Sequence, residues 1–221
     1  MKKKIIQTTE AVEIRLNKFI ANAGICSRRD ADQLILSGKI TVNDQVVQVL
    51  GTKIMPTDKI TYLKKIIQSE KLQYVLLNKP KDFITTTQDP QNRRTVMTLI
   101  EKACVERIYP VGRLDRHTTG LLLFTNDGDL AKRLTHPKYK IKKIYQLELD
   151  KPIIEAHYNE ITMGVHLEDG LAFVDHLAIL TDDRKRLGIE IHIGKNRIVR
   201  RIFEKYEFQC LTFYDHPSKS P

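Results

Sequence analysis

The sequence predicts an α+β protein with a small N-terminal α/β module and a larger domain built on a mainly antiparallel mixed sheet flanked by helices. Three observations support this prediction. Apolar residues recur at helical spacing near the N-terminus, alternating runs typical of half-buried strands follow later, and a basic polar stretch separates the two regions. We therefore expect a module at residues 13–63, a linker at 64–71 and the larger domain at 72–221.

The first helix of the module is indicated by apolar residues at helical spacing. Leu16, Phe19, Ile20 and Ala23 fall on one face, and Gly24 suits the C-terminal cap because glycine tolerates the left-handed conformation. The chain should turn at this glycine.

A second helix should begin after Ser27, a favourable N-cap residue, and end near Gly38. Its inward residues would be Ala31, Leu34 and Ile35.

A hairpin is expected directly after this helix. Residues 39–42 and 46–47 have strand character, and Asn43 and Asp44 between them tolerate a tight turn.

Arg28 and Arg29 are unusual because cations in the first turn of a helix oppose its macrodipole. A phosphate at this helix end would satisfy both arginines and the free backbone N–H groups. A solvated basic face is the ordinary alternative. The order of helix, Ser-Arg-Arg, helix, Gly-Lys and hairpin favours the phosphate.

The larger domain should contain strands at residues 74–77, 121–125, 145–149 and 188–193. A helix beginning near Arg200 would pack on the last two strands. The string Asp-Gly-Asp at 127–129 lacks the later ligands of a calcium loop, so we expect a tight turn there.

Asp115 lies between Arg113 and Arg116, next to the strand at 121–125. Opposite charge at close range favours the ionised form of a carboxyl group, which suits a nucleophile better than a proton donor. For an isolated string of this kind, a surface ion pair is the ordinary interpretation. The surrounding residues must decide between the two.

The formal net charge of +10 and the sequence pI near 9.4 make a polyanion the expected partner. Nucleic acid fits better than a membrane, because no long apolar run and no signal-peptide pattern is present. We expect a cytoplasmic protein. Three isolated cysteines and scattered histidines support neither a disulfide framework nor a metal site.

Residues 109–116 (Tyr-Pro-Val-Gly-Arg-Leu-Asp-Arg) and 119–130 (Thr-Gly-Leu-Leu-Leu-Phe-Thr-Asn-Asp-Gly-Asp-Leu) closely resemble the catalytic motif of bacterial ribosomal RNA pseudouridine synthases that modify single uridines. Further matches follow the order that this family shows: Leu-Asn-Lys-Pro at 77–80, Lys-Ile-Tyr at 143–145, Gly-Lys-Asn-Arg at 194–197 and Val-Arg-Arg at 199–201. Together they span most of the chain, and the resemblance is nearest to the large-subunit (23S) branch.

The N-terminal module, in turn, resembles the alpha-L RNA-binding motif, which is shared with a small-subunit ribosomal protein and some tRNA synthetases. It would dock on structured RNA.

The resemblance implies isomerisation of uridine to pseudouridine in ribosomal RNA, without a cofactor or a metal. Asp115 would be the essential acid, either attacking the ribose carbon or assisting its departure and the later deprotonation. Tyr145 would stack on the target base, and Arg200 would pair with Asp115. An ordinary alternative exists for each of these two, since strand tyrosines are often core residues and arginines often contact phosphate.

The residues expected to bind RNA share a positive charge. They are Arg15, Lys18, Arg28, Arg29 and Lys39 in the module, and Lys79, Arg113, Arg116, Lys143, Arg197 and Arg201 in the larger domain. For Lys79, Arg113, Arg116 and Arg197, support of Asp115 is an alternative to phosphate contact.

The expected partner is ribosomal RNA, bound by a monomer. A non-catalytic RNA-binding or ribosome-assembly factor is the alternative function, although Asp115, Tyr145 and Arg200 are all retained. A hydrolase ranks last because no second carboxylate stands at a recognisable spacing.

Overall fold

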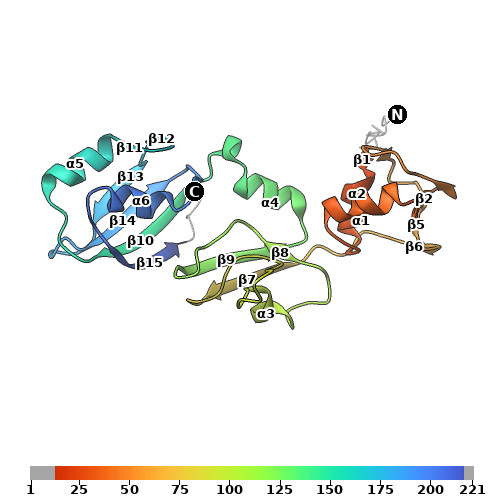
Figure 1. Ribbon diagram of the computed structural model, residues 1–221, viewed down its shortest axis with the longest axis horizontal. Helices are drawn as coiled ribbons and strands as arrows, with labels where there is room; N and C mark the ends of the chain where they lie inside the picture. The colour runs from red at the N-terminus through yellow and green to blue at the C-terminus, as the bar shows by residue number, and fades with distance from the viewer. Residues whose placement is uncertain (1–12, 217–221) are drawn as a thin grey trace, which may run out of the picture. The chain divides into compact units, whose positions relative to one another are not determined.

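The computed structural model describes residues 13–216, and contacts within the chain divide it into two compact units with a boundary between Leu72 and Gln73 (Figure 1). Unit 1 consists of β1 (Ile14–Arg15), α1 (Leu16–Asn22), α2 (Arg28–Leu36), β2 (Ile40–Val42), β3 (Gln45–Val46), β4 (Lys53–Ile54), β5 (Ile60–Tyr62) and β6 (Lys65–Ile66). Its sheet has the strand order β3-β2-β5-β6, and β1 pairs with β4.

The local features predicted for unit 1 are present. The Ser27 hydroxyl caps α2 by accepting a hydrogen bond from the Asp30 backbone N–H at 3.2 Å. Gly24 follows α1 with a φ of +73°. Asn43 and Asp44 have φ angles of +51° and +66°, the left-handed pair that a two-residue hairpin turn requires. Interactions between residues that are close in the sequence therefore determine these helix ends and this hairpin turn.

The core of unit 1 is apolar and lies between the two helices and the sheet. Its buried residues are Leu16, Ile20, Ala31, Ile35, Ile40, Ile54 and Ile60. Most of the inward residues expected for the helices are among them, with Phe19 and Leu34 partly buried against the cluster.

Residues 64–71 differ from the linker that the composition indicated. Within this stretch β6 pairs antiparallel with β5, and the Glu70 backbone N–H donates to the carbonyl of Asn22 at 2.8 Å. The backbone of this basic segment therefore completes unit 1, because β5 needs a partner on its open side.

Unit 2 begins with β7 (Tyr74–Lys79), α3 (Met97–Ile100), β8 (Tyr109–Pro110), β9 (Thr119–Thr125), α4 (Gly128–Thr135) and the 3-10 turn η1 (Pro137–Tyr139). It continues with β10 (Lys143–Leu149), α5 (Glu155–Met163), β11 (Val165–Leu167), β12 (Gly170–Ala172), β13 (His176–Ile179), β14 (Arg186–Ile191), α6 (Ile198–Glu204) and β15 (Cys210–His216).

The main sheet of unit 2 has the order β13-β14-β10-β15-β9-β7, with β8 also paired to β9. Every pairing in it is antiparallel except that of β15 with β9, where Tyr214 is opposite Thr119. This confirms the mainly antiparallel mixed sheet. The parallel pair joins two halves of the sheet that have separate apolar cores.

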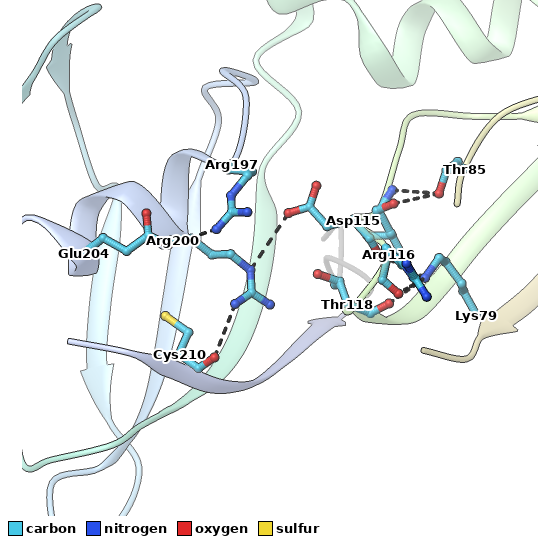
Figure 2. Close-up of polar contacts among 10 residues, drawn as sticks. Lys79, Thr85, Asp115, Arg116, Thr118, Arg197, Arg200, Glu204 and Cys210 are labelled. Carbon is cyan, nitrogen blue, oxygen red and sulfur yellow. Dashed lines mark hydrogen bonds and ion pairs between the residues drawn. The ribbon is translucent and has the colours of Figure 1, made fainter. Parts of the chain in front are cut away.

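One core lies on the β10–β14 half, where α6 contributes Ile202 and Phe203 and α5 contributes Ile161. The other lies on the β7–β9 half and contains Phe124 and Ile100. Because β9 is the strand at the junction, the loop that precedes it, residues 111–118, lies where the halves meet (Figure 2).

The tight turn expected at 127–129 is instead a helix start. The carboxylate of Asp127 accepts backbone hydrogen bonds from Asp129 at 3.1 Å and Leu130 at 2.9 Å, and so caps α4. An aspartate at this position fits both a turn and an N-cap, and the residues after it continue the helix.

Candidate active site

Asp115 lies on the 111–118 loop with a side chain 45% exposed. It lines an open groove of about 520 Å³, together with Arg113 and Arg116 from the same loop and Arg93 from the segment after β7. Asp89 lines the same groove and pairs with Arg93 at 2.6 Å. The Asp115 carboxylate is thus accessible to a ligand in a groove that also presents arginines.

Lys79, at the end of β7, fixes the backbone of this loop through hydrogen bonds. Its side chain is fully buried, and its ammonium donates to four backbone carbonyls: Pro80 at 3.0 Å, Asp115 at 3.0 Å, Arg116 at 3.3 Å and Thr118 at 2.9 Å. Three of these carbonyls belong to the loop (Figure 2). One buried charge therefore fixes the path of the loop backbone from Asp115 to Thr118.

The environment of Lys79 combines burial with charge. Burial lowers the pKa of the Lys79 ammonium below its ordinary value, while the carboxylates of Asp115 and Asp82 oppose this shift. The carbonyl contacts compensate the charge for lost hydration.

A buried threonine fixes the residue immediately before Asp115. Thr85 Oγ1 donates to the Leu114 carbonyl at 2.8 Å and accepts from the Leu114 N–H at 3.2 Å. Both polar groups of Leu114 are thereby bound, and the Leu114 side chain is buried in the core of the β7–β9 half. The loop can expose Asp115 without leaving the backbone beside it unpaired.

Arg200, from α6, approaches Asp115 from the other half of the sheet. Its Nε lies 3.9 Å from Asp115 Oδ2, and its side chain is only 16% exposed. Nη1 donates to the Cys210 carbonyl at 3.3 Å, and the guanidinium carbon lies 5.2 Å from the ring centroid of Phe213. These contacts orient the arginine toward the carboxylate (Figure 2).

Tyr145, on β10, is linked to this arrangement through Phe213. The two ring centroids are 4.9 Å apart with an interplanar angle of 34°. Arg200 and Tyr145 therefore contact the same ring, which is buried on β15.

The geometry suits chemistry on an anionic, polymeric ligand. A fixed, accessible carboxylate beside a guanidinium can stabilise a developing cation at a sugar carbon, and exposed arginines can receive phosphates. In residues 13–216, no group of three His, Cys, Asp or Glu side chains is placed to hold a metal ion. Across the same residues, no helix has the length and apolar character needed to cross a membrane.

Comparison with protein families decides the class of this site. A family model described as RNA pseudouridylate synthase matches residues 73–205, which is more than half of the chain. The chain belongs to this family. It is an enzyme, a pseudouridine synthase, and an S4 domain model matches residues 14–60 of its N-terminal unit.

Individual relatives are similar over most of this synthase. An uncharacterised RNA pseudouridine synthase of Aquifex aeolicus is 40% identical over 194 residues, covering 86% of this chain and 78% of the relative. The ribosomal large subunit pseudouridine synthase B of Bacillus subtilis is 41% identical, covering 86% and 79%. A solved structure, described as the crystal structure of pseudouridylate synthase, is 25% identical with a TM-score of 0.63, covering 92% and 88%.

The three residues predicted to be catalytic in the synthase lie in the same region of unit 2. Asp115 and Arg200 form the expected ion pair, and Tyr145 joins them through Phe213. Of the flanking arginines, Arg116 has a different partner from the one expected, since its Nε lies 3.3 Å from Asp82 Oδ1. The cation facing Asp115 comes from a distant helix.

Three of the predicted RNA-binding residues have charged groups that are engaged within unit 2. Lys79 is buried with its ammonium bound to carbonyls, so it has no donor left for phosphate. Arg201 Nη2 donates to Asp169 Oδ2 at 2.9 Å, which ties α6 to the turn between β11 and β12. Arg197 is half exposed and also paired, to Glu204 at 2.9 Å.

The other predicted RNA-binding residues lie at the surface. Arg15, Arg28, Arg29 and Lys39 are exposed on unit 1, Arg113 is exposed on unit 2, and Lys18 and Lys143 are partly exposed. Arg28 also makes a long contact of 3.4 Å with Asn17 Oδ1. The Ser27 cap occupies one N–H at the start of α2.

Sequence reasoning missed Thr85 and Phe213. Thr85 stands among three consecutive threonines, and only the fold shows which one reaches Leu114. Phe213 stands in a strand that pairs with both β10 and β9. Neither a sequence motif nor a periodic pattern identifies Thr85 or Phe213 as part of the site.

Proposed function

We propose that this synthase isomerises a specific uridine to pseudouridine in ribosomal RNA, and that the RNA is that of the large subunit. The observation that carries the proposal is the half-exposed Asp115 carboxylate, held by Lys79 and Thr85 on a fixed loop and facing Arg200. The Bacillus subtilis relative, named as a large-subunit synthase, supports the choice of RNA.

The reaction conserves every atom of the substrate except for an exchange of protons. The bond between the ribose carbon C1′ and the base nitrogen N1 breaks, the base rotates, and C1′ bonds to C5. The proton at C5 is lost and N1 gains one. Glycosidic cleavage develops positive charge on the sugar, and the Asp115 carboxylate stabilises this charge, either by bonding to C1′ or by its negative charge as the base departs. In the second case the carboxylate also assists the later deprotonation.

Arg200 holds Asp115 ionised and oriented in this scheme, and Tyr145 stacks on the target base. Extracting a uridine from a stack costs roughly a few kcal/mol, which phosphate contacts offset. The exposed cations of unit 1, including Arg28 and Arg29, supply such contacts on structured RNA. The enzyme acts in the cytoplasm as a monomer and needs no cofactor, metal or membrane.

The test is tritium release from ribosomal RNA transcripts labelled at C5 of uridine. We expect release from large-subunit RNA with the wild-type protein and with Asp182→Asn, an exposed control substitution of the same kind. Asp115→Asn should abolish release while RNA affinity changes less than about twofold, because the exposed cations that carry RNA binding are unchanged.

Three outcomes would count against the proposal. Release by Asp115→Asn would refute the role of this acid, and release from small-subunit RNA alone would reassign the substrate. Binding of both RNAs by the wild-type protein without any release would support the non-catalytic factor, which the comparisons do not favour.

A further inference from the structure

The segment between β9 and β10 carries an unusually one-sided charge. From Leu130 to Leu147 the sequence contains no aspartate or glutamate, and the cations are Lys132, Arg133, Lys138, Lys140, Lys142 and Lys143. We call residues 132–143 the basic strap. It comprises the end of α4, the turn η1 and the entry into β10.

Much of this charge is exposed. In the part of the chain that the structure describes, Lys132, Lys138 and Lys140 are exposed and form no ion pair. Lys142, in contrast, pairs with Glu190 at 2.6 Å. Lys132 complements the dipole of α4 at its C-terminus, which is a sufficient structural reason for that residue. Lys138 and Lys140 lie beyond α4, where this reason does not apply.

An aromatic ring is exposed among these cations. Tyr139 is 40% exposed, and Lys138 Nζ lies 4.7 Å from its ring centroid. The imidazole of His136 meets the same ring edge-on, with centroids 6.3 Å apart and an interplanar angle of 78°. Lys140 adopts a left-handed conformation with φ of +48°, which turns the chain from η1 toward β10. The ring is therefore supported but still accessible.

Near both of its ends, the strap approaches a loop that leads to an active-site residue. At one end, Thr135 Cγ2 lies 3.9 Å from the position that a Cβ on Gly112, in the Asp115 loop, would occupy. At the other end, Lys143 Nζ lies 3.6 Å from the equivalent position on Gly194, in the loop that leads to α6 and Arg200. Figure 1 shows that α4 and the turn after it connect β9, in one half of unit 2, to β10, in the other half.

We propose that the basic strap binds single-stranded RNA next to the target uridine, with Lys138 and Lys140 on phosphates and Tyr139 stacked on an unpaired base. Cations on either side of an exposed aromatic ring are the chemistry that such a strand requires. The strand is single because the target nucleotide must leave its stack to reach Asp115. The inference rests on the proposed function in that RNA is the substrate.

The first test removes the two phosphate contacts. Lys138→Gln with Lys140→Gln is compared with Lys102→Gln and Lys151→Gln, a double variant of equal charge change at exposed lysines outside the strap. Binding of a stem-loop with unpaired flanking nucleotides is measured from about 50 to about 300 mM salt, the range in which such contacts are sensitive.

The strap variant should flatten the slope of log K against log salt by about 0.7 per lysine, and the control variant should do so by much less. KM should rise severalfold with kcat at saturating RNA unchanged. Equal slopes in the two double variants would overturn the phosphate assignment. A slope that flattens in the strap variant while the wild-type protein shows no turnover would defeat the proposed function and leave this inference standing.

The second test concerns the ring. Tyr139→Leu should weaken binding about tenfold, the effect of losing one stacked base, whereas Tyr139→Phe should bind as the wild type does. Shortening the RNA to remove the unpaired flanks should abolish the difference between the two variants. Equal affinity of the Leu and Phe variants for the full RNA, with both folded by circular dichroism, would show that no base stacks there.

Discussion

Arg200 Nε lies 3.9 Å from Asp115 Oδ2, although the two residues come from different halves of the sheet of unit 2. The arginine is held in place by the Cys210 carbonyl and the face of Phe213, both independent of Asp115. The ion pair therefore depends on the parallel pairing of β15 with β9, which brings the halves together.

Arg200→Lys should lower kcat at least about tenfold with RNA affinity nearly unchanged. A lysine keeps the charge but loses the planar group that contacts the carbonyl, the ring and the carboxylate together. Single-turnover tritium release measures the effect, with Arg186→Lys on β14 as the matched control. A variant with wild-type kcat would show that orientation of Asp115 does not depend on the guanidinium.

Thr85→Val should lower kcat while leaving KM for RNA unchanged, and Thr85→Ser should restore most of the activity. Valine keeps the shape but removes the hydroxyl that binds both polar groups of Leu114, the residue before Asp115. The stability loss should be about 1–2 kcal/mol. Thr98→Val, at an exposed hydroxyl, serves as the control. Equal activity of the Val and Ser variants would contradict a positioning role.

Lys79→Met should destabilise the protein by at least about 2 kcal/mol, because it leaves several buried carbonyls without a donor. The loss is measured by chemical denaturation. Lys81→Met, at an exposed neighbouring lysine, should change stability by less than about 0.5 kcal/mol. If the two variants were equally stable, the carbonyl contacts of Lys79 would not hold the loop.

The Asp127 cap of α4 should make stability depend on pH in the acid range. Hydrogen bonds from the backbone N–H of Leu130, and further ones from Tyr74 and Asp129, lower the pKa of the Asp127 carboxyl below its ordinary 3.8. Because the folded pKa lies below the unfolded value, this stabilisation is present above pH 3.8 and is lost as the pH falls through the folded pKa.

The measurement compares melting temperatures of wild type and Asp127→Asn across this range. The wild type should melt at a higher temperature than Asp127→Asn near neutral pH. This difference in melting temperature should vanish once the pH falls below the folded pKa of Asp127. Asp127→Ala should cost about 1 kcal/mol near neutral pH, since the cap itself is lost. A difference between wild type and Asp127→Asn that does not change with pH would show that the charge plays no part.

The sequence by itself determined the local elements and the chemical class of the protein. Ser27 begins α2, and Asn43 with Asp44 turns the first hairpin, because caps and turns depend on residues within a few positions of each other. The strands around residues 145–149 and 188–193 were evident from alternation alone. The motif around Asp115 indicated the synthase family, which the comparison with family models confirmed.

The tertiary structure decided which partner each charged group has. Lys79 was expected to contact phosphate or to support Asp115, and it is buried with its ammonium on the carbonyls of the Asp115 loop. Arg116 pairs with Asp82, and Asp115 faces Arg200 from a distant helix. The physical reason is that burial and ion pairing depend on strand order and register, which bring distant residues together. Residue type and sequence spacing limit these long-range contacts but do not select among them.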